Sequence, residues 1–351
     1  MRILGSRGVP ARYGGFETLA ERLQFEFTSD GIKCDVIGTR DPQSQESFFG
    51  WLVTHRPFRS LETPLLTWVN RNHGDTASTD RTVLIVNPIN VFTAMALQRS
   101  GHQVALHMDG MEDQRSKWGR FLRLMHRTAR RIAVHSNLLL VTDSKAIQEW
   151  YLATHNRATE MITYGGCVAA ETNNSHRWLL TESSDFFMVV ARPEPENQIL
   201  EMCQAFIASG STHRLVIVGA PIGKSKYWTS VMELVSNHPN IELAGSIWNR
   251  QQLCDLYCST LGVIHGHTVG GTNPALVDAL SHGCPVMAHD NAYNREVLGE
   301  NVSLWNSVDA LAEMLRNYEP RQFSVDVDGF LKSYNWEKVA QSYQHILNLH
   351  P

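Results

Sequence analysis

Short apolar runs alternate with longer segments of helical periodicity along nearly the whole chain of 351 residues. A parallel strand can pair with the next only after a crossover, which is usually a helix. This alternation therefore predicts parallel sheets covered by helices on both faces. The runs form two series separated by a polar stretch, so we predict an α/β protein with two doubly wound domains. The apolar runs lie at 2–4, 34–37, 83–86, 104–107, 138–141, 187–191, 215–218, 241–243, 261–264 and 286–288.

The domain limits follow from the same pattern. A chain of this length exceeds what a single hydrophobic core usually serves. We expect a first domain over 1–168, a second over 169–334, and a C-terminal helix at 335–351 that packs back onto the first. Strand order within 41–80 stays open, because Pro, Ser and Thr interrupt the pattern there.

Composition and charge restrict the classes of function. A hydrophobic fraction of 43%, a charged fraction of 19% and a net charge of −4 are typical of a soluble globular protein, without the basicity of a nucleic-acid binder. We therefore expect no nucleic-acid partner. The apolar N-terminus is too short for a signal peptide, and no stretch reaches the roughly 18 apolar residues of a membrane-spanning helix. The six cysteines show no Cys-x-x-Cys spacing, so a reducing cytoplasm is favoured.

The segment 265–274 has the pattern of an anion-binding loop between a strand and a helix. Gly270 and Gly271 allow the backbone to approach a ligand closely, and Pro274 suits the first position of a helix. The amides at such a helix start favour a phosphate group. A second polar loop, 289–296, follows the next strand, so two strand ends are expected to converge on one crevice.

A glycine-rich loop at 5–17 follows the first strand and opens an amphipathic helix. Its spacing is not the G-x-G-x-x-G of a nicotinamide-binding turn, and no Walker lysine follows the glycines. A dehydrogenase or a P-loop enzyme is therefore disfavoured.

The segment 5–18 resembles the opening signature of bacterial rhamnosyltransferase-type enzymes within the family-4 glycosyltransferases. This resemblance implies a GT-B fold: two Rossmann-like domains facing a cleft, with the acceptor side in 1–168 and the nucleotide-sugar site in 169–334. It also implies retaining transfer of rhamnose or another hexose from a nucleoside-diphosphate donor. The expected acceptor is a saccharide, lipid-linked, in surface polysaccharide synthesis. Further matching segments are 108–112, 117–119, 142–144, 192–197, 265–274 and 294–299.

The resemblance assigns donor-binding roles to residues from both domains. Arg192 follows the first strand of the second domain and can bind a phosphate in bidentate fashion, although an ion pair with Glu194 or Glu196 is an alternative. Such fixed donors can stabilise a departing diphosphate without a metal. Whether Arg295 contacts the ligand or forms a structural ion pair stays open. The other expected donor-binding residues are Gly14, Gly15, Asn197, His267, Gly270, Gly271, Thr272, Asn273, Asp278, Asn294 and Glu296.

The chain departs from the broader family at three positions. The usual diphosphate-binding lysine falls at Asn197, and the two family glutamates fall at Gly270 and Asp278. Asp278 can still accept hydrogen bonds from a donor ribose. These departures leave two alternatives open: a catalytically silent sugar-nucleotide binder, and a non-hydrolysing sugar-nucleotide epimerase, which shares the two-domain architecture.

Asp109 and Glu112, after a strand of the first domain, are the catalytic candidates together with Arg192. They are expected to orient the acceptor hydroxyl or the donor sugar, and a solvated loop carboxylate is the alternative for Glu112. In a front-face transfer, which the family is thought to use, the leaving phosphate oxygen takes the acceptor proton. We expect no metal or other cofactor, because the D-x-D triplet at 326–328 follows no central strand and the His265 and His267 pair lacks a third ligand.

The segment 117–132 predicts an amphipathic basic helix, with four arginines placed on one face. Such a helix can hold a protein against an anionic inner leaflet, where a lipid-linked acceptor would lie. The alternative is that its apolar side packs into the domain. We therefore expect a cytoplasmic enzyme that is peripheral at the inner face of the plasma membrane. The arginines are Arg120, Arg123, Arg127 and Arg130.

Overall fold

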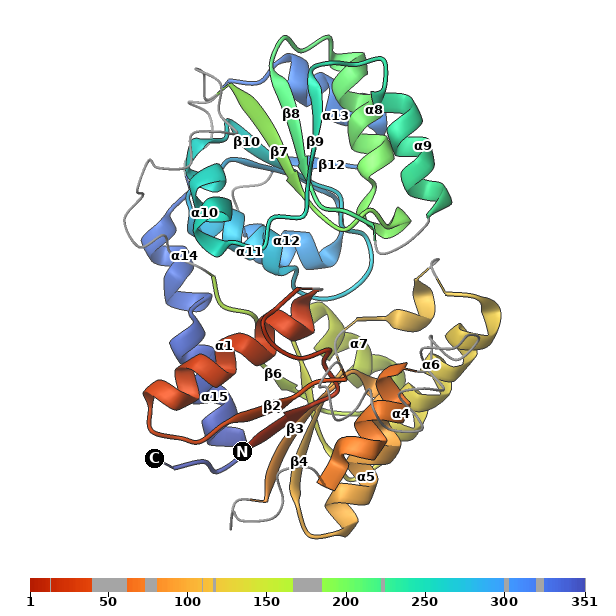
Figure 1. The fold of residues 1–351 in the computed structure, drawn as a ribbon, viewed down its shortest axis with the longest axis vertical. Coiled ribbons are helices and arrows are strands. Elements are labelled where there is room, and N and C mark those ends of the chain that lie inside the picture. Colours follow the sequence, from red (N-terminus) through yellow and green to blue (C-terminus); the bar gives the residue numbers. More distant parts are fainter. Residues whose placement is uncertain are drawn as a thin grey trace. The chain divides into compact units, whose positions relative to one another are not determined.

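The computed structural model divides into two compact units, Met1–Tyr164 with Trp336–Pro351 and Gly165–Asn335 (Figure 1). Each unit contains one six-stranded sheet among the described residues, and every strand pair is parallel. The predicted class, an α/β protein with two doubly wound sheets, is confirmed. The expected boundary at 168 and 169 lies outside the described residues. These are 1–12, 14–39, 62–72, 81–108, 110–115, 118–166, 185–221, 225–299, 303–319 and 325–350.

The sheet of the first unit has the order β2-β1-β3-β4-β5-β6. Its strands are β1 (Arg2–Leu4), β2 (Asp35–Ile37), β3 (Thr82–Val86), β4 (Gln103–His107), β5 (Leu139–Thr142) and β6 (Glu160–Met161). The helices are α1 (Gly15–Ser29), α4 (Glu62–Val69), α5 (Val91–Arg99), α6 (Arg120–Val134), α7 (Lys145–His155) and α15 (Trp336–Ile346).

Strand order in this sheet reverses between β1 and β3, where the chain turns to build the other half. The loop after β1 passes directly over the end of β3. Gly5 adopts a positive φ of 93°, and a Cβ at this position would collide with the carbonyl oxygen of Val86. Only glycine fits there, because both the conformation and the close approach exclude a side chain.

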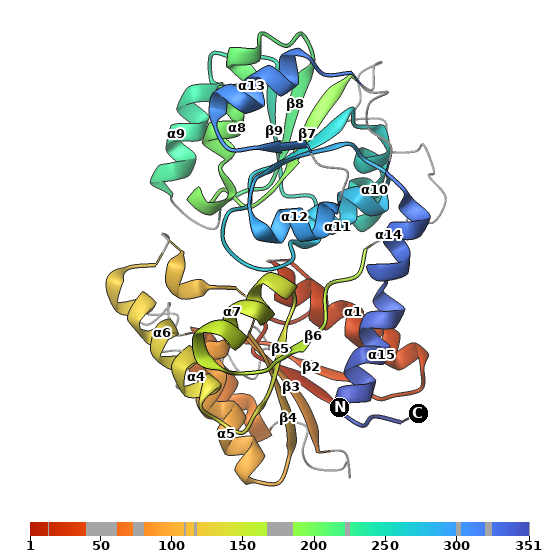
Figure 2. The ribbon, with the colours of Figure 1, turned by 180° about the vertical axis from the view of Figure 1, so that it is seen from behind.

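The last helix belongs to the first unit, although 171 residues of the second unit, Gly165–Asn335, separate it from the rest of that unit in sequence. Figure 2 shows α15 beside α1. Val339, Tyr343 and Leu347 of α15 share one buried cluster with Leu23 and Phe27 of α1. A helix that follows the second unit in sequence therefore covers part of the apolar surface of α1.

The sheet of the second unit has the order β12-β11-β10-β7-β8-β9, and its strand order reverses between β7 and β10. Its strands are β7 (Phe186–Val190), β8 (Arg214–Val218), β9 (Ile241–Gly245), β10 (Gly262–His265), β11 (Val286–His289) and β12 (Ser303–Trp305). The helices are α8 (Ile199–Ser209), α9 (Lys226–Val235), α10 (Arg250–Ser259), α11 (Pro274–Ser281), α12 (Ala292–Leu298), α13 (Val308–Arg316) and α14 (Val327–Ser333).

Helices cover both faces of this second sheet, and alternate strand residues point to opposite faces. Phe187 and Val189 of β7 pack in a cluster with α8, α9 and α13. Phe186 and Met188 of the same strand pack in another cluster with α10, α11 and α12. A strand buried on both faces carries a continuous apolar run, which is why the sequence pattern locates it.

Candidate functional site

The second unit brings several predicted site residues to the carboxyl ends of β7 and β10. Ligands of open α/β sheets bind where the strand order reverses, and these two strands flank that point. Arg192 lies two residues after β7, with Nη1 3.4 Å from Oε1 of Glu194. The ion pair considered as an alternative for Arg192 is therefore present. Because the Arg192 side chain keeps 30% of its surface exposed, this pair contributes little to stability.

Asn197 and His267 form a direct side-chain contact between the loops that follow β7 and β10. Asn197 ends the short 3₁₀ helix η6 (Pro195–Asn197) and donates from Nδ2 to the carbonyl oxygen of Arg192 at 2.8 Å. Its Oδ1 lies 2.9 Å from Nδ1 of His267. Both side chains are buried, so the contact is shielded from water. The position at which the resemblance would place a lysine is thus occupied by an amide that bonds to neighbouring residues.

Close backbone contacts also join the loops that follow β7 and β10. The amide nitrogen of Thr268 donates to the carbonyl oxygen of Glu196 at 2.9 Å, and Thr268 Oγ1 donates to the same oxygen at 3.0 Å. A Cβ at Gly266 would lie 2.5 Å from the carbonyl oxygen of Asn197. Glycine at 266 therefore allows the two loops to touch.

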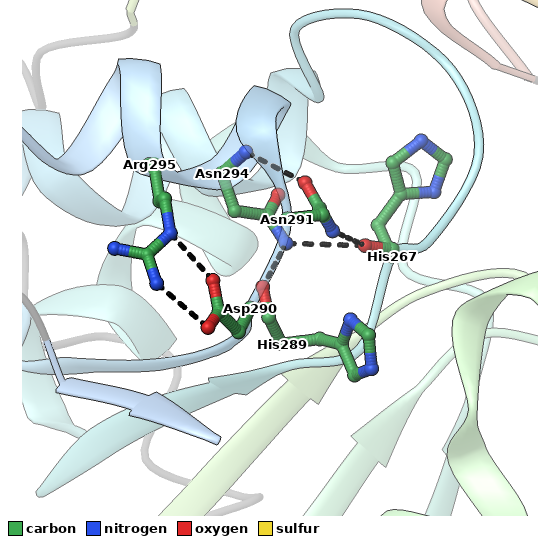
Figure 3. Close-up of polar contacts among 6 residues, drawn as sticks. All are labelled: His267, His289, Asp290, Asn291, Asn294 and Arg295. Carbon is green, nitrogen blue, oxygen red and sulfur yellow. Dashed lines mark hydrogen bonds and ion pairs between the residues drawn. The ribbon is translucent and has the colours of Figure 1, made fainter. Parts of the chain in front are cut away.

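Two asparagines donate hydrogen bonds to the backbone of His267 (Figure 3). Asn291 and Asn294 each donate from Nδ2 to the carbonyl oxygen of His267, at 2.7 and 3.1 Å. Asn294 also donates to the carbonyl oxygen of His289 at 2.8 Å, which joins the ends of β10 and β11. With only 1% of its surface exposed, Asn294 positions the loop backbone.

The neighbouring arginine settles an alternative that the sequence left open. Arg295 binds Asp290 with both Nε and Nη2, at 2.6 and 2.7 Å (Figure 3). It forms the structural ion pair. Glu296, one residue later, lies near Tyr334, whose pKa is raised to about 12 by burial first and by the Glu296 charge second.

The start of α11 has the form expected for an anion-binding helix. Asn273 is the N-cap residue, and its Oδ1 accepts from the amide of Ala275 at 3.0 Å. Pro274 occupies the first turn, as predicted. Gly270 has a φ of 139°, which favours glycine, and Gly270, Gly271 and Thr272 are all buried.

Asp278 lies further along α11, within one turn of its C-terminal end. Its Oδ1 is 3.9 Å from Nη2 of Arg250 on α10, at the limit of an ion pair. Its charge also helps to raise the pKa of buried Tyr257, although burial is the larger cause. The carboxylate predicted to bind ribose is therefore close to α10.

Two further histidines at the strand ends are electrically neutral near pH 7. Burial lowers the pKa of His265 to about 4, and nearby His289 contributes in the same direction. The pKa of His289 is also lowered, again mainly by burial. Within the described part of the chain, no group of three or more His, Cys, Asp or Glu side chains is arranged to hold a metal ion.

The glycine-rich loop of the first unit folds back onto the start of α1. Gly14 is the N-cap residue in extended conformation, and no side chain caps the helix there. Glu17 accepts a hydrogen bond from the amide of Arg7 at 2.9 Å, and Glu21 accepts one from the amide of Ala11 at 3.0 Å. These two loop amides are committed within the unit, whereas Gly14 and Gly15 stand at the helix start.

Glu112 is held by neighbouring side chains and is not the solvated loop carboxylate considered as its alternative. Its Oε1 lies 3.0 Å from Nε of Arg115, and its Oε2 accepts from Nε1 of Trp118 at 2.6 Å. The other carboxylate candidate, Asp109, lies outside the described residues. Both carboxylate oxygens of Glu112 are thus bound by side chains that follow it closely in sequence.

The predicted four-arginine face of 117–132 is wrong in one respect. Arg130 points inward: Nη1 lies 2.9 Å from Oδ1 of buried Asp113, and the guanidinium stacks over Trp150. Asp113 is not among the predicted site residues, because sequence spacing does not indicate a pair between Asp113 and Arg130. Residues 116 and 117 lie outside the described part.

The exposed surface of α6 instead combines two large apolar side chains with basic ones. Phe121 and Leu124 are 70% and 58% exposed. Arg120, Arg127 and Arg131 are also exposed. No helix among the described residues has both the length and the apolar character needed to cross a bilayer.

Comparisons with known proteins identify the fold. Residues 1–58 match a family described as a domain of unknown function, DUF1972. No curated protein matches the sequence. The structure is similar to sucrose-phosphate synthase from Thermosynechococcus elongatus, with 15% identity, a TM-score of 0.78, and coverage of 99% of this chain and 98% of that chain.

Two further solved structures match over nearly their full length. Anabaena HepE in complex with UDP-glucose shares 14% identity at a TM-score of 0.71, with 99% of this chain and 98% of that chain covered. The UDP-forming α,α-trehalose-phosphate synthase of Burkholderia xenovorans shares 11% identity at a TM-score of 0.71, with 99% of each chain covered. At these identities the likeness concerns the fold, and the predicted GT-B fold is confirmed.

Proposed function

We propose that the chain is a retaining glycosyltransferase that moves a hexosyl group, rhamnose or another hexose, from a nucleoside-diphosphate donor to a saccharide acceptor. The main support is the set of contacts between the loops that follow β7 and β10, where the strand order of the second sheet reverses. There Arg192, the Asn197–His267 contact and the start of α11 lie on loops that are bonded to one another or follow neighbouring strands. Solved structures of similar fold hold UDP and UDP-glucose, which supports a nucleotide-sugar as the donor.

The proposed chemistry needs fixed positive charge and amide donors at the diphosphate. Arg192 supplies the cation, and the amides of Gly270, Gly271 and Thr272 supply hydrogen bonds as negative charge develops on the leaving group. Gly14 and Gly15 are proposed to add amides from the start of α1. Asp278 is proposed to accept hydrogen bonds from the ribose. The reaction is proposed to proceed without a metal.

In a front-face retaining transfer the leaving phosphate oxygen takes the acceptor proton, so the protein needs no strong base. The commitment of Glu112 to Arg115 and Trp118 is compatible with this scheme. We propose that Asp109 orients the acceptor hydroxyl and that Glu112 shapes the loop around it.

Arg192→Ala tests the proposal most directly. We expect transfer from UDP-glucose, or from whichever nucleotide sugar in a panel stabilises the protein, to slow about 100-fold or more. Arg214→Ala is the matched control, because Arg214 forms an ion pair of the same 3.4 Å length with Glu242 at the other end of the sheet. An unchanged rate in Arg192→Ala would remove this residue from the mechanism.

The two alternative functions give different results with the same reagents. An epimerase would convert the nucleotide sugar without any acceptor. A silent binder, which Gly270 in place of a glutamate favours, would bind UDP-glucose and transfer nothing to any acceptor in the panel. Incubation of the wild-type protein with donor alone, and then with donor and acceptors, separates the three functions.

The acceptor is proposed to be lipid-linked, with the protein peripheral at an anionic inner leaflet. Support comes from α6, where Phe121 and Leu124 are exposed beside basic side chains. We expect salt-sensitive co-sedimentation with phosphatidylglycerol vesicles, weakened about tenfold by the double substitution Phe121→Ser and Leu124→Ser. Phe25→Ser, which removes a 60% exposed phenyl ring from α1, is the control. Equal binding by all variants would exclude α6 as the docking surface.

A further inference from the structure

One buried guanidinium joins three elements of the first unit. Arg130 lies on α6, and its Nη1 is 2.9 Å from Oδ1 of Asp113 in the short 3₁₀ helix η4 (Glu112–Gln114). The same nitrogen donates to the sulfur atom of Met111 at 3.3 Å, and Cζ lies over Trp150 of α7, 4.6 Å from the ring centroid. The loop that follows β4 is therefore bound to two helices through a single side chain.

Burial makes the ion pair of Arg130 stronger than an ion pair at the surface. The side chains of Arg130 and Asp113 keep only 11% and 5% of their surface exposed. Attraction between opposite charges is weakly screened in such surroundings, and loss of one partner leaves the other charge buried without compensation. The Arg130 charge also acts on His155 of α7, whose pKa is lowered by burial first and by Arg130 second. Breaking this pair should therefore disturb the interior of the unit.

The set of contacts requires the geometry of an arginine. A guanidinium can bind a carboxylate through its N–H groups while its flat face lies over an aromatic ring, whereas a lysine ammonium is a compact charge. Met111, on the loop side, is only 3% exposed. The loop therefore cannot shift relative to α6 and α7 without breaking a contact of this guanidinium.

The loop fixed in this way is the one that the proposed function places at the acceptor. Residues 110–115 follow the carboxyl end of β4, where open α/β sheets bind ligands. They include Glu112, which is proposed to shape the loop around the acceptor hydroxyl. Phe121 precedes Arg130 by about two and a half turns of α6, so the two side chains point to opposite sides of the helix. One side of α6 anchors the loop, and the other side exposes Phe121 and Leu124.

We propose that Asp113 and Arg130 are positioning residues, whose ion pair fixes the loop 110–115 on α6 and thereby sets the affinity for the saccharide acceptor. The role in acceptor binding rests on the proposed function. The fixing of the loop does not, since it follows from contacts within the first unit. The charged residues proposed to bind the donor, Arg192 and Asp278, belong to the second unit, so the affinity for the donor should not depend on this pair.

Hydrogen exchange of the full-length protein without ligands tests the fixing of the loop. In Asp113→Ala the amides of 110–115 should exchange about tenfold faster or more, because the loop loses its anchor. Leu97→Ala is the control. Leu97 is buried on α5, and its carbonyl oxygen accepts from the amide of His102, which directly precedes β4 at the end opposite to the loop. This control destabilises the same unit and should leave exchange in 110–115 unchanged. Unchanged exchange in Asp113→Ala, or an equal increase in Leu97→Ala, would overturn the proposal.

Transfer from UDP-glucose to octyl β-glucoside, a saccharide with an alkyl chain, tests the role in acceptor binding. Asp113→Ala should raise the KM for octyl β-glucoside about tenfold and leave the KM for UDP-glucose unchanged. Leu97→Ala should change neither value. A general loss of structure would raise both KM values together, and that result in Asp113→Ala would overturn the proposal.

A double variant separates positioning from stability. Asp113→Ala alone leaves the Arg130 charge buried without its carboxylate, whereas adding Arg130→Met removes both charges and keeps an apolar side chain of similar length beside Trp150. The double variant should unfold at a higher urea concentration than Asp113→Ala and still show the raised KM for octyl β-glucoside, because the loop stays unanchored. A return of this KM to the wild-type value would assign the effect to the unpaired charge and overturn the proposal.

Failure of the proposed function gives a different result. If the wild type glycosylates another saccharide of the acceptor panel in place of octyl β-glucoside, the same KM comparison is made with that saccharide. If the wild type transfers nothing to any acceptor, the proposed function fails, and the role in acceptor binding fails with it. Hydrogen exchange would still decide whether the ion pair of Asp113 and Arg130 fixes the loop.

Discussion

At the scale of single residues, the buried imidazole of His265 makes folding depend on pH. Its pKa falls from the ordinary 6.5 to about 4 in the folded chain, mainly because burial disfavours the charged ring. Between these two values the unfolded chain binds a proton that the folded chain does not. Through this group the free energy of unfolding therefore falls as the pH is lowered from about 6.5 towards 4. Above about pH 6.5 the group no longer changes it.

We predict that His265→Gln reduces this pH dependence. Between about pH 7 and pH 5 the wild type should lose about 2 kcal/mol of its free energy of unfolding through this group, and the variant should lose correspondingly less. Urea unfolding at a series of pH values measures the slope. Some slope should persist, because the pKa of His289 is lowered too. His135→Gln, at an exposed position, is the control and should keep the wild-type slope.

Sequence reasoning located the candidate residues better than it assigned their partners. Motif positions placed Arg192, Asn197 and His267 after strands, where ligands bind. The contact between Asn197 and His267 joins positions 70 apart in sequence, and no periodicity predicts such a contact. Glu112 contacts an arginine three residues later and a nearby tryptophan, and these contacts depend on rotamers that sequence spacing does not specify.

At the scale of elements, the N-cap of α11 links helix stability to the site. We predict that Asn273→Ala lowers the free energy of unfolding by about 1 kcal/mol, because the amide of Ala275 loses its acceptor. Asn273→Ser retains an acceptor and should stay within a few tenths of a kcal/mol of the wild type. Urea denaturation of the wild type and the two variants measures these free energies of unfolding. Equal decreases for Asn273→Ala and Asn273→Ser would mean that the capping hydrogen bond does not stabilise the helix.

The sequence predicted elements well where strands are buried on both faces. Each of the ten apolar runs is a strand whose ends lie within two residues of the expected ones. The two strands that were not predicted, β6 and β12, both lie at sheet edges. An edge strand needs fewer buried residues: β6 has none, and β12 buries only Trp305. A short strand of this kind leaves no apolar run to recognise.

At the scale of the whole molecule, the first unit depends on a helix that follows the second unit in sequence. Residues 1–164 contain the six described strands of that unit, yet α15, which follows the second unit in sequence, supplies part of its core. Trp336 at the start of α15 packs edge-to-face against Tyr164, the last residue of the first segment. The chain therefore leaves the first unit at Tyr164 and re-enters it at Trp336, and these two residues are in contact.

We predict that Tyr343→Ala destabilises the first unit and leaves the second unchanged. Tyr343 is fully buried against α1, and truncating an aromatic side chain in such a core costs about 3 kcal/mol. The side chains of α15 pack in the core of the first unit. The rate of amide hydrogen exchange should therefore increase in peptides from α1 and β1 and not in those from β7 and α8. Gln341→Ala, exposed on the same helix, is the control and should change neither set. Increased exchange in the second unit alone, or equally in both, would contradict the assignment of α15 to the first core.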